Sequence, residues 1–396
     1  LKKGLKQMKK GKNEAGITLI ALTITIIVLL ILAGVTISAL SGDNGILQNA
    51  GKAKEETEQA EKEEIKKLNM LEAATNFQNK EYKDGKGNIA TIPAGFAVSQ
   101  VSGENIIDEG LVIIDSKGNE FVWIPVNNIN EMAMCINSSD DSTCDLVIEN
   151  NELVCKTHDS KEICGKLYAT ISGENFDANR PNLVYKENEG YREPDLLNVY
   201  DNEDKEYLSD IGYDTDSFMK EIKSEYIEMI KSVKKYKGFY VGRYETSNDG
   251  ENVASKKNCK SLNAENASMW YGLYAKQKTY QTDSVQGGMI WGSQYDAMMR
   301  WMDDDTTATT DINTPDLTSG TRNLTTITGS NEDDKIKNVY DLYGSVHEWT
   351  LEADGTGGRV LRGGYFDSAY SPSVRGNSYP DNKTINIGSR ITLYIK

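Results

Sequence analysis

The fold is decided by two short stretches near the C-terminus, VYDLYGSVHEW (residues 339–349) and RVLRGG (residues 359–364). Both combine a short apolar run with glycine. Gly363 and Gly364 permit backbone conformations that are closed to other residues, and Trp349 supplies a large side chain for a core with little regular structure. We expect short strands and many turns in this part of the chain.

Two arginines bound the segment that follows: Arg362 opens it and Arg390 ends it. A guanidinium group is planar and donates hydrogen bonds in a fixed fork. We therefore expect both arginines to tie loops together through carboxylates or carbonyls, and we assign them a structural role.

Towards the N-terminus, from about residue 83, short apolar runs are separated by glycine and asparagine. Gly110–Val126 predicts two strands on either side of a turn, and Tyr236–Ser247 predicts another strand. Residues 203–235 and 293–302 have helical periodicity. This order predicts an α+β domain with short antiparallel strands, many loops and few helices.

Five blocks in this order resemble the formylglycine-generating-enzyme superfamily, whose fold is a variant of the C-type lectin fold. The blocks are residues 110–126, 238–246, 289–302, 339–349 and 359–364, with a closing stretch at 387–390. The resemblance implies a lectin-like head domain over residues 83–396. The cysteine-containing segment at about residues 128–170 is then an insertion.

The resemblance does not extend to the superfamily's chemistry. Its formylglycine-making members hold copper with a cysteine pair near the C-terminus, and here no cysteine follows Cys259. Other members use histidine-rich metal sites, whereas this chain has only His158 and His347, the latter where the family usually carries tryptophan. We expect no catalytic residues, no required cofactor and no enzymatic activity.

Calcium is the one metal that the resemblance implies. Family members hold it near the block that corresponds to residues 338–349, and Ser345 stands where they usually carry asparagine. Oxygen atoms are the ligands that calcium prefers, but the chain is so acidic that their abundance identifies no ligand set. The metal ligands therefore stay unknown.

The segment from Arg362 to Arg390 reads RGGYFDSAYSPSVRGNSYPDNKTINIGSR. Its Tyr, Ser, Asn and Gly residues supply rigid area and adaptable hydrogen bonds, as in antibody paratopes, and are also typical of ordinary turns. The segment resembles the variable region of proteins diversified by diversity-generating retroelements. That resemblance implies the ligand-facing positions Tyr365, Asp367, Ser368, Tyr370, Asn377, Ser378, Tyr379, Ile385 and Asn386.

The N-terminal part predicts a membrane anchor. Residues 17–40 form a run of 24 residues without a charge, and a helix of that length reaches about 36 Å, enough to cross a hydrocarbon core of ~30 Å. The lysine-rich leader, residues 1–16, predicts a cytoplasmic N-terminus and an exported remainder. An ordinary signal peptide and a plain single-pass anchor are the alternatives.

The junction Glu14-Ala15-Gly16-Ile17 resembles the processing site of type IV prepilins. The resemblance implies that a prepilin peptidase cuts after Gly16 and leaves Ile17 as the first mature residue. Pilins carry glutamate where this chain has Ala21, and an amine left unpaired in the apolar bundle is costly. We expect a minor or tip subunit, or an anchor that never polymerises.

A second helical stretch, residues 46–79, has an apolar seam among Glu and Lys residues and predicts a solvated stalk. Together with the apolar run it gives one expected membrane and stalk helix over residues 17–80. That long helix, followed by the lectin-like head, completes the predicted architecture.

Four cysteines cluster in the insertion: Cys135, Cys144, Cys155 and Cys164. In an exported chain they predict disulfides. A four-thiolate zinc site is the competing interpretation, although zinc ligands prefer shorter spacings. The stretch between Cys144 and Cys155 reads as a hairpin that turns at Asn150–Asn151, and the pairing of the four cysteines stays open.

The charge excludes one class of partner. Sixty acidic residues against 44 basic ones give a net charge of -16, and such a surface repels phosphate backbones, so we expect no nucleic acid. The predicted function is a pilin-like protein at the cell surface or in a pilus that binds an unknown external protein or glycan, as an adhesin or receptor. Exported enzyme and structural minor pilin are the alternatives.

Overall fold

The computed structural model describes residues 25–29, 46–129, 132–137, 143–150, 152–163, 165–169, 202–263, 265, 269–302, 323–353, 358–367, 372 and 374–396. The chain divides into two compact units, Leu1–Glu64 and Ile65–Lys396. The helix α2 (Ile46–Thr75) begins in the first unit and ends in the second. The candidate site lies in the second unit.

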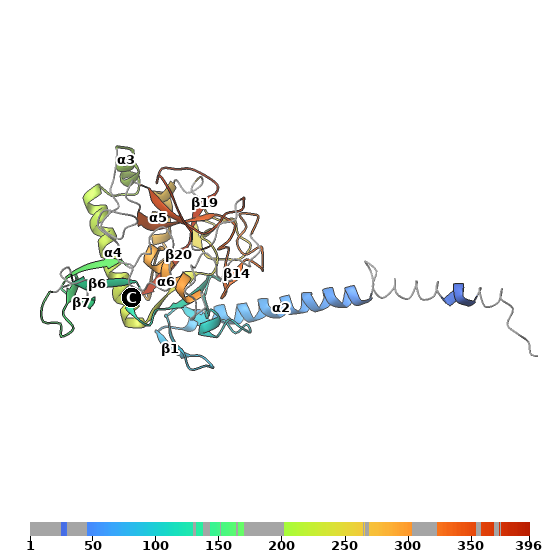
Figure 1. The fold of residues 1–396 in the computed structure, drawn as a ribbon. Coiled ribbons are helices and arrows are strands. Elements are labelled where there is room, and N and C mark those ends of the chain that lie inside the picture. The colour runs from blue at the N-terminus through green and yellow to red at the C-terminus, as the bar shows by residue number, and fades with distance from the viewer. Residues whose placement is uncertain are drawn as a thin grey trace, which may run out of the picture. The chain divides into compact units, whose positions relative to one another are not determined.

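The largest sheet of the second unit has six antiparallel strands in the order β13-β20-β10-β5-β4-β3. Of these strands, β20 is labelled in Figure 1. Their bounds are β3 (Phe96–Val98), β4 (Val112–Asp115), β5 (Glu120–Pro125), β10 (Gly238–Gly242), β13 (Val285–Met289) and β20 (Ile391–Ile395). The last strand of the chain, β20, pairs with both β10 and β13. The C-terminal segment is therefore built into the interior of the sheet.

A second sheet carries the segment of interest, in the strand order β18-β17-β16-β19. Its strands are β16 (His347–Ala353), β17 (Arg359–Arg362), β18 (Arg375–Ser378) and β19 (Ile387–Ser389). β16 and β17 are antiparallel, as are β17 and β18, whereas β16 and β19 run parallel. The two sequence stretches that decide the fold thus become neighbouring strands.

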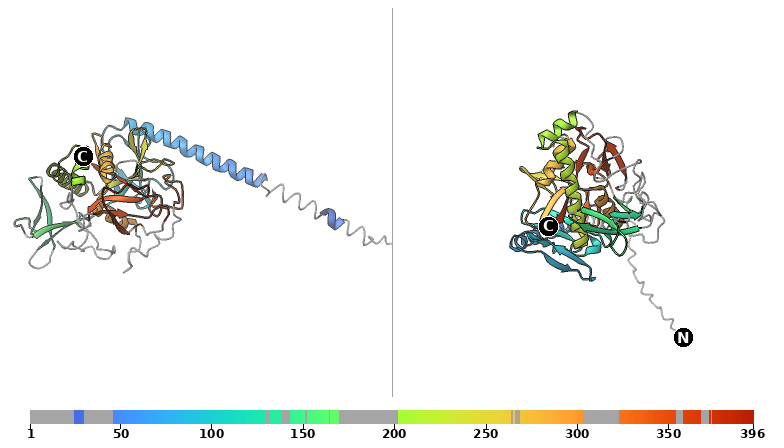
Figure 2. Two further views of the ribbon diagram at one scale, coloured as in Figure 1. Left: turned by 90° about the horizontal axis from the view of Figure 1, so that it is seen from above. Right: turned by 90° about the vertical axis from the view of Figure 1, so that its left-hand side faces the viewer.

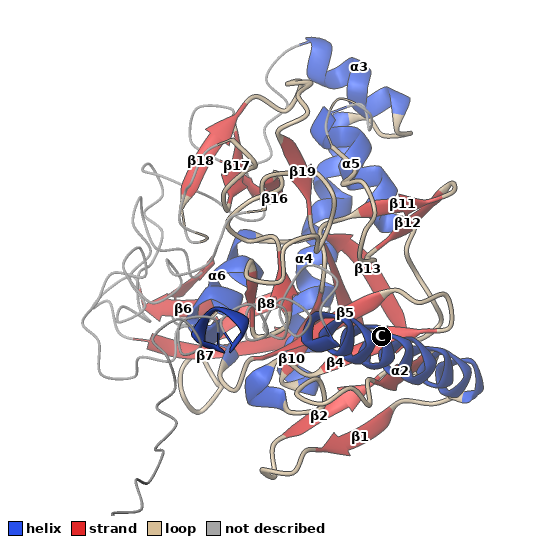
Figure 3. Cartoon of the chain, turned by 90° about the vertical axis from the view of Figure 1, so that its right-hand side faces the viewer, coloured by secondary structure: helices blue, strands red, loops and turns tan. Residues whose placement is uncertain are grey.

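Smaller sheets surround these two (Figure 3). One has the order β8-β7-β6-β9 and is made of β6 (Ala133–Asn137), β7 (Thr143–Glu149), β8 (Glu152–Lys156) and β9 (Gly165–Ala169). The others are the pairs β1–β2 (Lys80–Lys83, Ile89–Ile92), β11–β12 (Ser247–Asp249, Asn252–Ala254) and β14–β15 (Lys335–Ile336, Val339–Tyr340). The hairpin predicted across Asn150–Asn151 is confirmed, because Glu149 pairs with Glu152.

Helices pack against the six-stranded sheet (Figure 2). The helices on the sheet are α4 (Thr215–Tyr236), α5 (Met269–Lys278) and α6 (Gly292–Met302), whereas α3 (Asn202–Asp210) contacts α4. A short 3-10 turn, η1, lies at Ile107–Glu109. α4 packs on β10 and β20. Its N-terminus is held by a capping box between Asp214 and Ser217, which satisfies backbone donors that the first turn leaves open.

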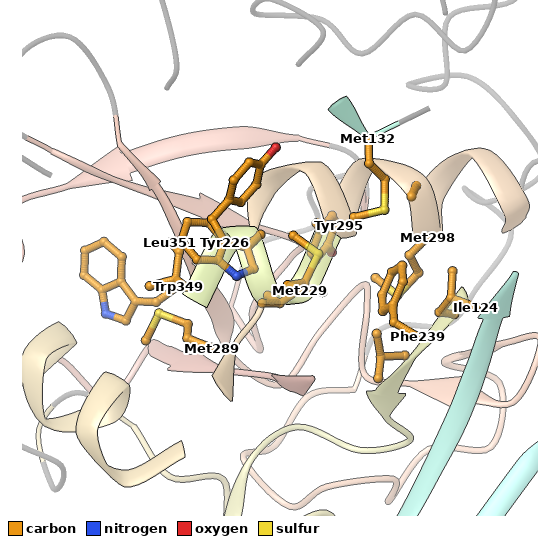
Figure 4. Packing of buried hydrophobic residues seen from close by; sticks show 14 of the residues in the cluster. Ile124, Met132, Tyr226, Met229, Phe239, Met289, Tyr295, Met298, Trp349 and Leu351 are labelled. Atoms are coloured by element: carbon orange, nitrogen blue, oxygen red, sulfur yellow. The ribbon is translucent and has the colours of Figure 1, made fainter. Parts of the chain in front are cut away.

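The six-stranded sheet separates two hydrophobic clusters because side chains alternate along each strand. From β5, Val122 and Ile124 enter the cluster that α4 and α6 cover, whereas Phe121 and Trp123 enter the cluster on the other face. Figure 4 shows the first cluster, in which Trp349 of β16 lies among Tyr226, Met289 and Leu351. Trp349 is fully buried, so the second sheet shares its core with the first.

The expected fold class is wrong. The structure is a mixed α/β assembly of many strands in six sheets with a parallel strand pair, and not an α+β lectin-like head behind one long membrane and stalk helix. Residues 17–40 lie outside the described residues except for the helical stretch 25–29. Among the residues described, no helix combines the length and the apolar character needed to cross a membrane.

Several predictions of single strands and helices within residues 83–396 are confirmed. The two strands of Gly110–Val126 are β4 and β5, and the strand in Tyr236–Ser247 is β10. Residues 203–235 form α3 and α4, and residues 293–302 lie in α6. Each of these segments has an apolar period that a single element satisfies, so local pattern is enough to find it.

Candidate functional site

The candidate surface stands on a buried ionic frame. Arg362 Nη1 donates to Asp296 Oδ1 of α6 at 2.9 Å, and Arg375 Nη2 pairs with Asp296 Oδ2 at 2.5 Å. Arg375 Nε also donates to Glu352 Oε1 of β16 at 2.9 Å. All four side chains are fully buried, so the frame fixes the strands β16, β17 and β18 to α6.

The two carboxyl groups of this frame differ in their pKa. Burial alone would raise the pKa of Asp296, but the two arginines that bind it directly hold that pKa below its ordinary value. Burial raises the pKa of Glu352 despite the attraction of Arg375 and Arg362. The difference follows from geometry, because Arg362 lies at 3.7 Å from Glu352 Oε2 and contacts Asp296 more closely.

A second buried arginine, Arg390, ties the end of the segment 362–390 to other strands. Arg390 Nε donates to Glu348 Oε1 at 2.9 Å, while Nη1 and Nη2 donate to the carbonyl oxygens of Gly242 and Tyr340 at 2.8 and 2.7 Å. One side chain therefore links β16 to the end of β10 and to β15. A planar fork suits this task because its donors point in fixed directions.

Gly363 has a structural reason to be glycine. Its φ of 75° lies in the left-handed region, which favours a residue without Cβ. An added Cβ would lie 3.0 Å from the carbonyl oxygen of Leu342. Gly364 follows it in the same turn, and its N–H donates to that carbonyl at 3.1 Å.

His347 lies between the two loops that carry predicted ligand-facing residues. Its ring packs against the ring of Tyr365 in a tilted arrangement, with 4.7 Å between centroids and 45° between the planes. Its backbone N–H donates to the carbonyl oxygen of Asn386 at 2.8 Å. His347 is not among the ligand-facing residues predicted from the sequence, although it lies inside the stretch 339–349.

The protonation of His347 follows from its partners. The Nδ1 atom lies 2.8 Å from the carbonyl oxygen of Gly363, and a carbonyl only accepts, so Nδ1 carries the proton. Burial lowers the pKa of His347 below its ordinary value, against the opposing effect of the carbonyl. The lowered pKa favours the uncharged imidazole at neutral pH.

The predicted ligand-facing residues fall into two groups. The first, Tyr365, Asp367, Ile385 and Asn386, lies in the two loops that contact His347, with Tyr365 and Asn386 half-buried and Asp367 and Ile385 exposed. The second, Asn377, Ser378 and Tyr379, lies on the outer strand β18 and at its exit, where Tyr379 is 68% exposed. Ser368 and Tyr370 lie outside the described residues.

The structure brings the first group together and leaves the second at the other end of β17. Ser378 pairs with Arg359, three residues before Arg362 in β17, so it lies away from Gly363. The hydroxyl of Ser378 accepts a hydrogen bond from Asn382 Nδ2 at 2.8 Å. This bond holds the turn that leads from Tyr379 towards Ile385.

The residues of the segment 338–349 do not fit calcium. Asp341 accepts from Asn323 Nδ2 at 2.9 Å and from the Gly329 N–H at 2.7 Å, and Glu348 is bound to Arg390. Asn338 turns its amide nitrogen, a donor, towards backbone carbonyls. Over the described part of the chain, no group of three or more His, Cys, Asp or Glu residues is placed to hold a metal ion.

The remaining predicted residues are the cysteines and the two processing residues. Cys144 and Cys155 are each disulfide-bonded, and Cys259 is a free cysteine. The side chains of Cys135 and Cys164 are outside the described part of the chain, as are the processing residues Gly16 and Ile17. Sequence reasoning missed Arg375, whose flanking Ser, Gly and Asn residues resemble an exposed turn.

Comparison with known proteins adds a single likeness. No family model matches the chain, and no curated protein matches it. A solved structure, "Treponema denticola variable protein 1", is similar with 16% sequence identity and a TM-score of 0.23, over 69% of this chain and 95% of that one. Neither the prepilin nor the formylglycine-generating-enzyme resemblance gains a family match.

Proposed function

We propose that the protein binds an external ligand through its C-terminal surface and catalyses no reaction there. The display surface comprises Tyr365, Asp367, Ile385 and Asn386 in the two loops that contact His347, and a second group, Asn377, Ser378 and Tyr379, on β18 and at its exit. The observation that carries the proposal is a contrast within one short segment. Arg362, Arg375 and Arg390 are buried and bonded, whereas Tyr379 and Ile385 are 68% and 47% exposed.

This contrast suits display for a physical reason. Buried charge pairs with good geometry hold a backbone in one arrangement, and breaking one is strongly destabilising. Exposed side chains on such a backbone can change with little effect on stability. Tyrosine, serine and asparagine then provide contact area and adaptable hydrogen bonds at low entropic cost. A frame of this kind supports a binding site whose contact residues can be exchanged.

We extend the proposal to the location. The disulfide bonds of Cys144 and Cys155 support an oxidising compartment, because disulfides persist mainly outside the cytosol. We infer an exported protein at the cell surface, acting as an adhesin or receptor. The prepilin-like junction at Gly16 and Ile17 adds a pilus, with other pilin subunits as neighbours, to the proposed locations.

The first test asks whether the display surface is diversified. Codons 330–396 are sequenced deeply from many cells of one source population. We expect substitutions to gather on Tyr365–Asn386 at the exposed positions, with Arg362, Arg375 and Arg390 unchanged. A segment that is invariant throughout would end the diversification part of the proposal and leave a receptor with a fixed ligand.

The second test asks whether the display surface binds. The full chain is applied to glycan and protein arrays beside the variant Tyr365→Ser/Tyr379→Ser/Ile385→Ser. The control variant Lys80→Ser/Asp333→Ser changes exposed residues elsewhere. We expect the control to keep every captured ligand and the surface variant to lose about tenfold or more in signal, because a few aromatic contacts dominate most interfaces. Equal loss in both variants, or none in either, contradicts the proposal.

A further inference from the structure

Four carboxyl groups lie buried together beneath the display surface. Glu245, Asp334, Asp341 and Glu348, here called the carboxyl cluster, are each at most 1% exposed. Among the described residues, Arg390 is the one guanidinium that binds a member directly, through Glu348. Arg362 and Tyr295 also interact electrostatically with Glu348. Four ionised carboxylates here would far exceed the positive charge that faces them.

Neutral donors hold the other three carboxyl groups. Glu245 accepts from the hydroxyls of Ser261 and Ser345, at 2.5 and 2.6 Å, and from the Val346 N–H at 3.0 Å. Asp341 is bound by an amide and a backbone N–H, and Asp334 by the N–H groups of Asn323 and Tyr343.

Glu348 differs from the other three carboxyl groups of the cluster. Within the described residues, its Oε2 atom is buried and has no hydrogen-bond donor. A buried charge without compensation is costly, and a carboxyl group relieves the cost by taking up a proton. The geometry therefore favours protons within the carboxyl cluster at a pH where exposed carboxyl groups have lost them.

We propose that the carboxyl cluster is a proton-dependent clamp on residues 341–347, closed while the cluster holds protons and loosened as these protons are lost. The clamp acts on the two loops that contact His347. Glu245 holds Ser345 and Val346, the Ser345 carbonyl accepts from the Phe366 N–H at 3.0 Å, and the next residue, His347, holds the Asn386 loop. The clamp therefore affects the folding stability of the chain whether or not a ligand is bound.

The titration of the cluster agrees with this geometry. Burial raises the pKa of Glu245 well above its ordinary range, and the neighbouring Asp341 and Glu348 raise it further. Burial raises the pKa of Asp341 to about 7, with Asp334 adding to the rise and hydrogen bonds from Asn323 and Gly329 opposing it. In the unfolded chain both groups titrate at about 4.

The direction of the pH effect follows from these pKa values. Between about pH 4 and 7 the folded state holds a proton at Asp341 that the unfolded chain has already lost. Stability therefore falls as the pH rises through this window, by about tenfold in the unfolding equilibrium constant per pH unit for one such proton. His347 contributes in the opposite sense, because its pKa is lowered on folding.

The test compares the full chain with Glu245→Gln and Asp341→Asn, each of which removes one titratable carboxyl group from the cluster. Urea unfolding is measured in steps from about pH 5 to pH 8. We expect each variant to flatten the loss of stability with pH, by up to about tenfold per pH unit in the unfolding constant relative to the unaltered chain. The control Asp333→Asn alters an exposed carboxyl group and should leave the pH profile unchanged.

Hydrogen exchange of the unaltered chain keeps the inference testable if a variant fails to fold. After correction for the intrinsic rate, we expect exchange in residues 341–347 and 363–366 to accelerate between about pH 6 and pH 8 more than in β10. Parallel pH profiles for the unaltered chain and both variants would overturn the proposal. So would an acceleration in β10 equal to that in residues 341–347.

Discussion

Arg375 of β18 and Asp296 of α6 form a fully buried ion pair, with 2.5 Å between Nη2 and Oδ2. The pair joins an edge strand of one sheet to a helix that packs on another. Arg375 stands between the loop after Gly363 and the exposed Asn377 and Tyr379, so it anchors the display surface from its middle. The outer strand is therefore held by charge as well as by its hydrogen bonds to β17.

Replacement of Arg375 by methionine should unfold much of this frame. The change leaves Glu352 Oε1 and Asp296 Oδ2 buried without the guanidinium that contacts them, and losing one partner of a buried pair costs about 3–5 kcal/mol. The free energy of unfolding from urea titration measures the effect. Lys383→Met removes an exposed cation from the same segment and should change stability by less than about 0.5 kcal/mol. Similar values for the two variants would show that Arg375 is not an anchor.

Gly110 and Gly95 offer a matched pair of glycine substitutions. Both have positive φ, 92° and 85°, but an added Cβ at Gly110 would lie 1.8 Å from the carbonyl oxygen of Lys337, whereas at Gly95 nothing lies within 4 Å. Gly95→Ala should cost about 1–2 kcal/mol, the strain of the left-handed conformation alone. Gly110→Ala should cost at least about 2 kcal/mol more, because backbone must move. Thermal unfolding of both variants compares them, and equal losses would contradict the close approach.

Exposed positions of the display surface should tolerate substitution. Tyr379→Ser and Ile385→Ser remove side chains that are 68% and 47% exposed, so each should change the free energy of unfolding by no more than about 0.5 kcal/mol. Trp349→Ala, which empties a fully buried position, should cost about 3–5 kcal/mol. Chemical denaturation measures all three. A large loss at Tyr379 would place it in the packing of the head rather than on the surface.

The thiols should differ in reactivity. Cys259 is free and half-buried, so iodoacetamide should label it in the folded or unfolded chain without reduction. Cys144 and Cys155, being disulfide-bonded, should be labelled only after reduction and denaturation. Mass spectrometry of the tryptic peptides reads both outcomes. Labelling of Cys144 in the unreduced, denatured chain would remove the disulfide and with it the support for an oxidising compartment.

Much of the head could be predicted from local pattern. The paired strands β4 and β5, the helix α6 and the hairpin across Asn150–Asn151 each follow from a period of apolar residues or from turn residues within one short segment. The prediction of one long membrane and stalk helix over residues 17–80 was wrong. A hydrophobic run indicates what a segment can form alone, and no helix among the described residues is both long enough and apolar enough to cross a membrane.

The candidate site combines features that the sequence predicts with others that only the tertiary structure decides. From the sequence one can mark the polar, tyrosine-rich segment and the glycine turn at Gly363. Which of its residues face inward was decided by partners far away: Arg375 is buried because Asp296 of α6 meets it, 79 residues earlier. His347 joins Tyr365 to Asn386 because β16 lies between β17 and β19. Such pairings depend on long-range contacts, and a local period of side chains carries no information about them.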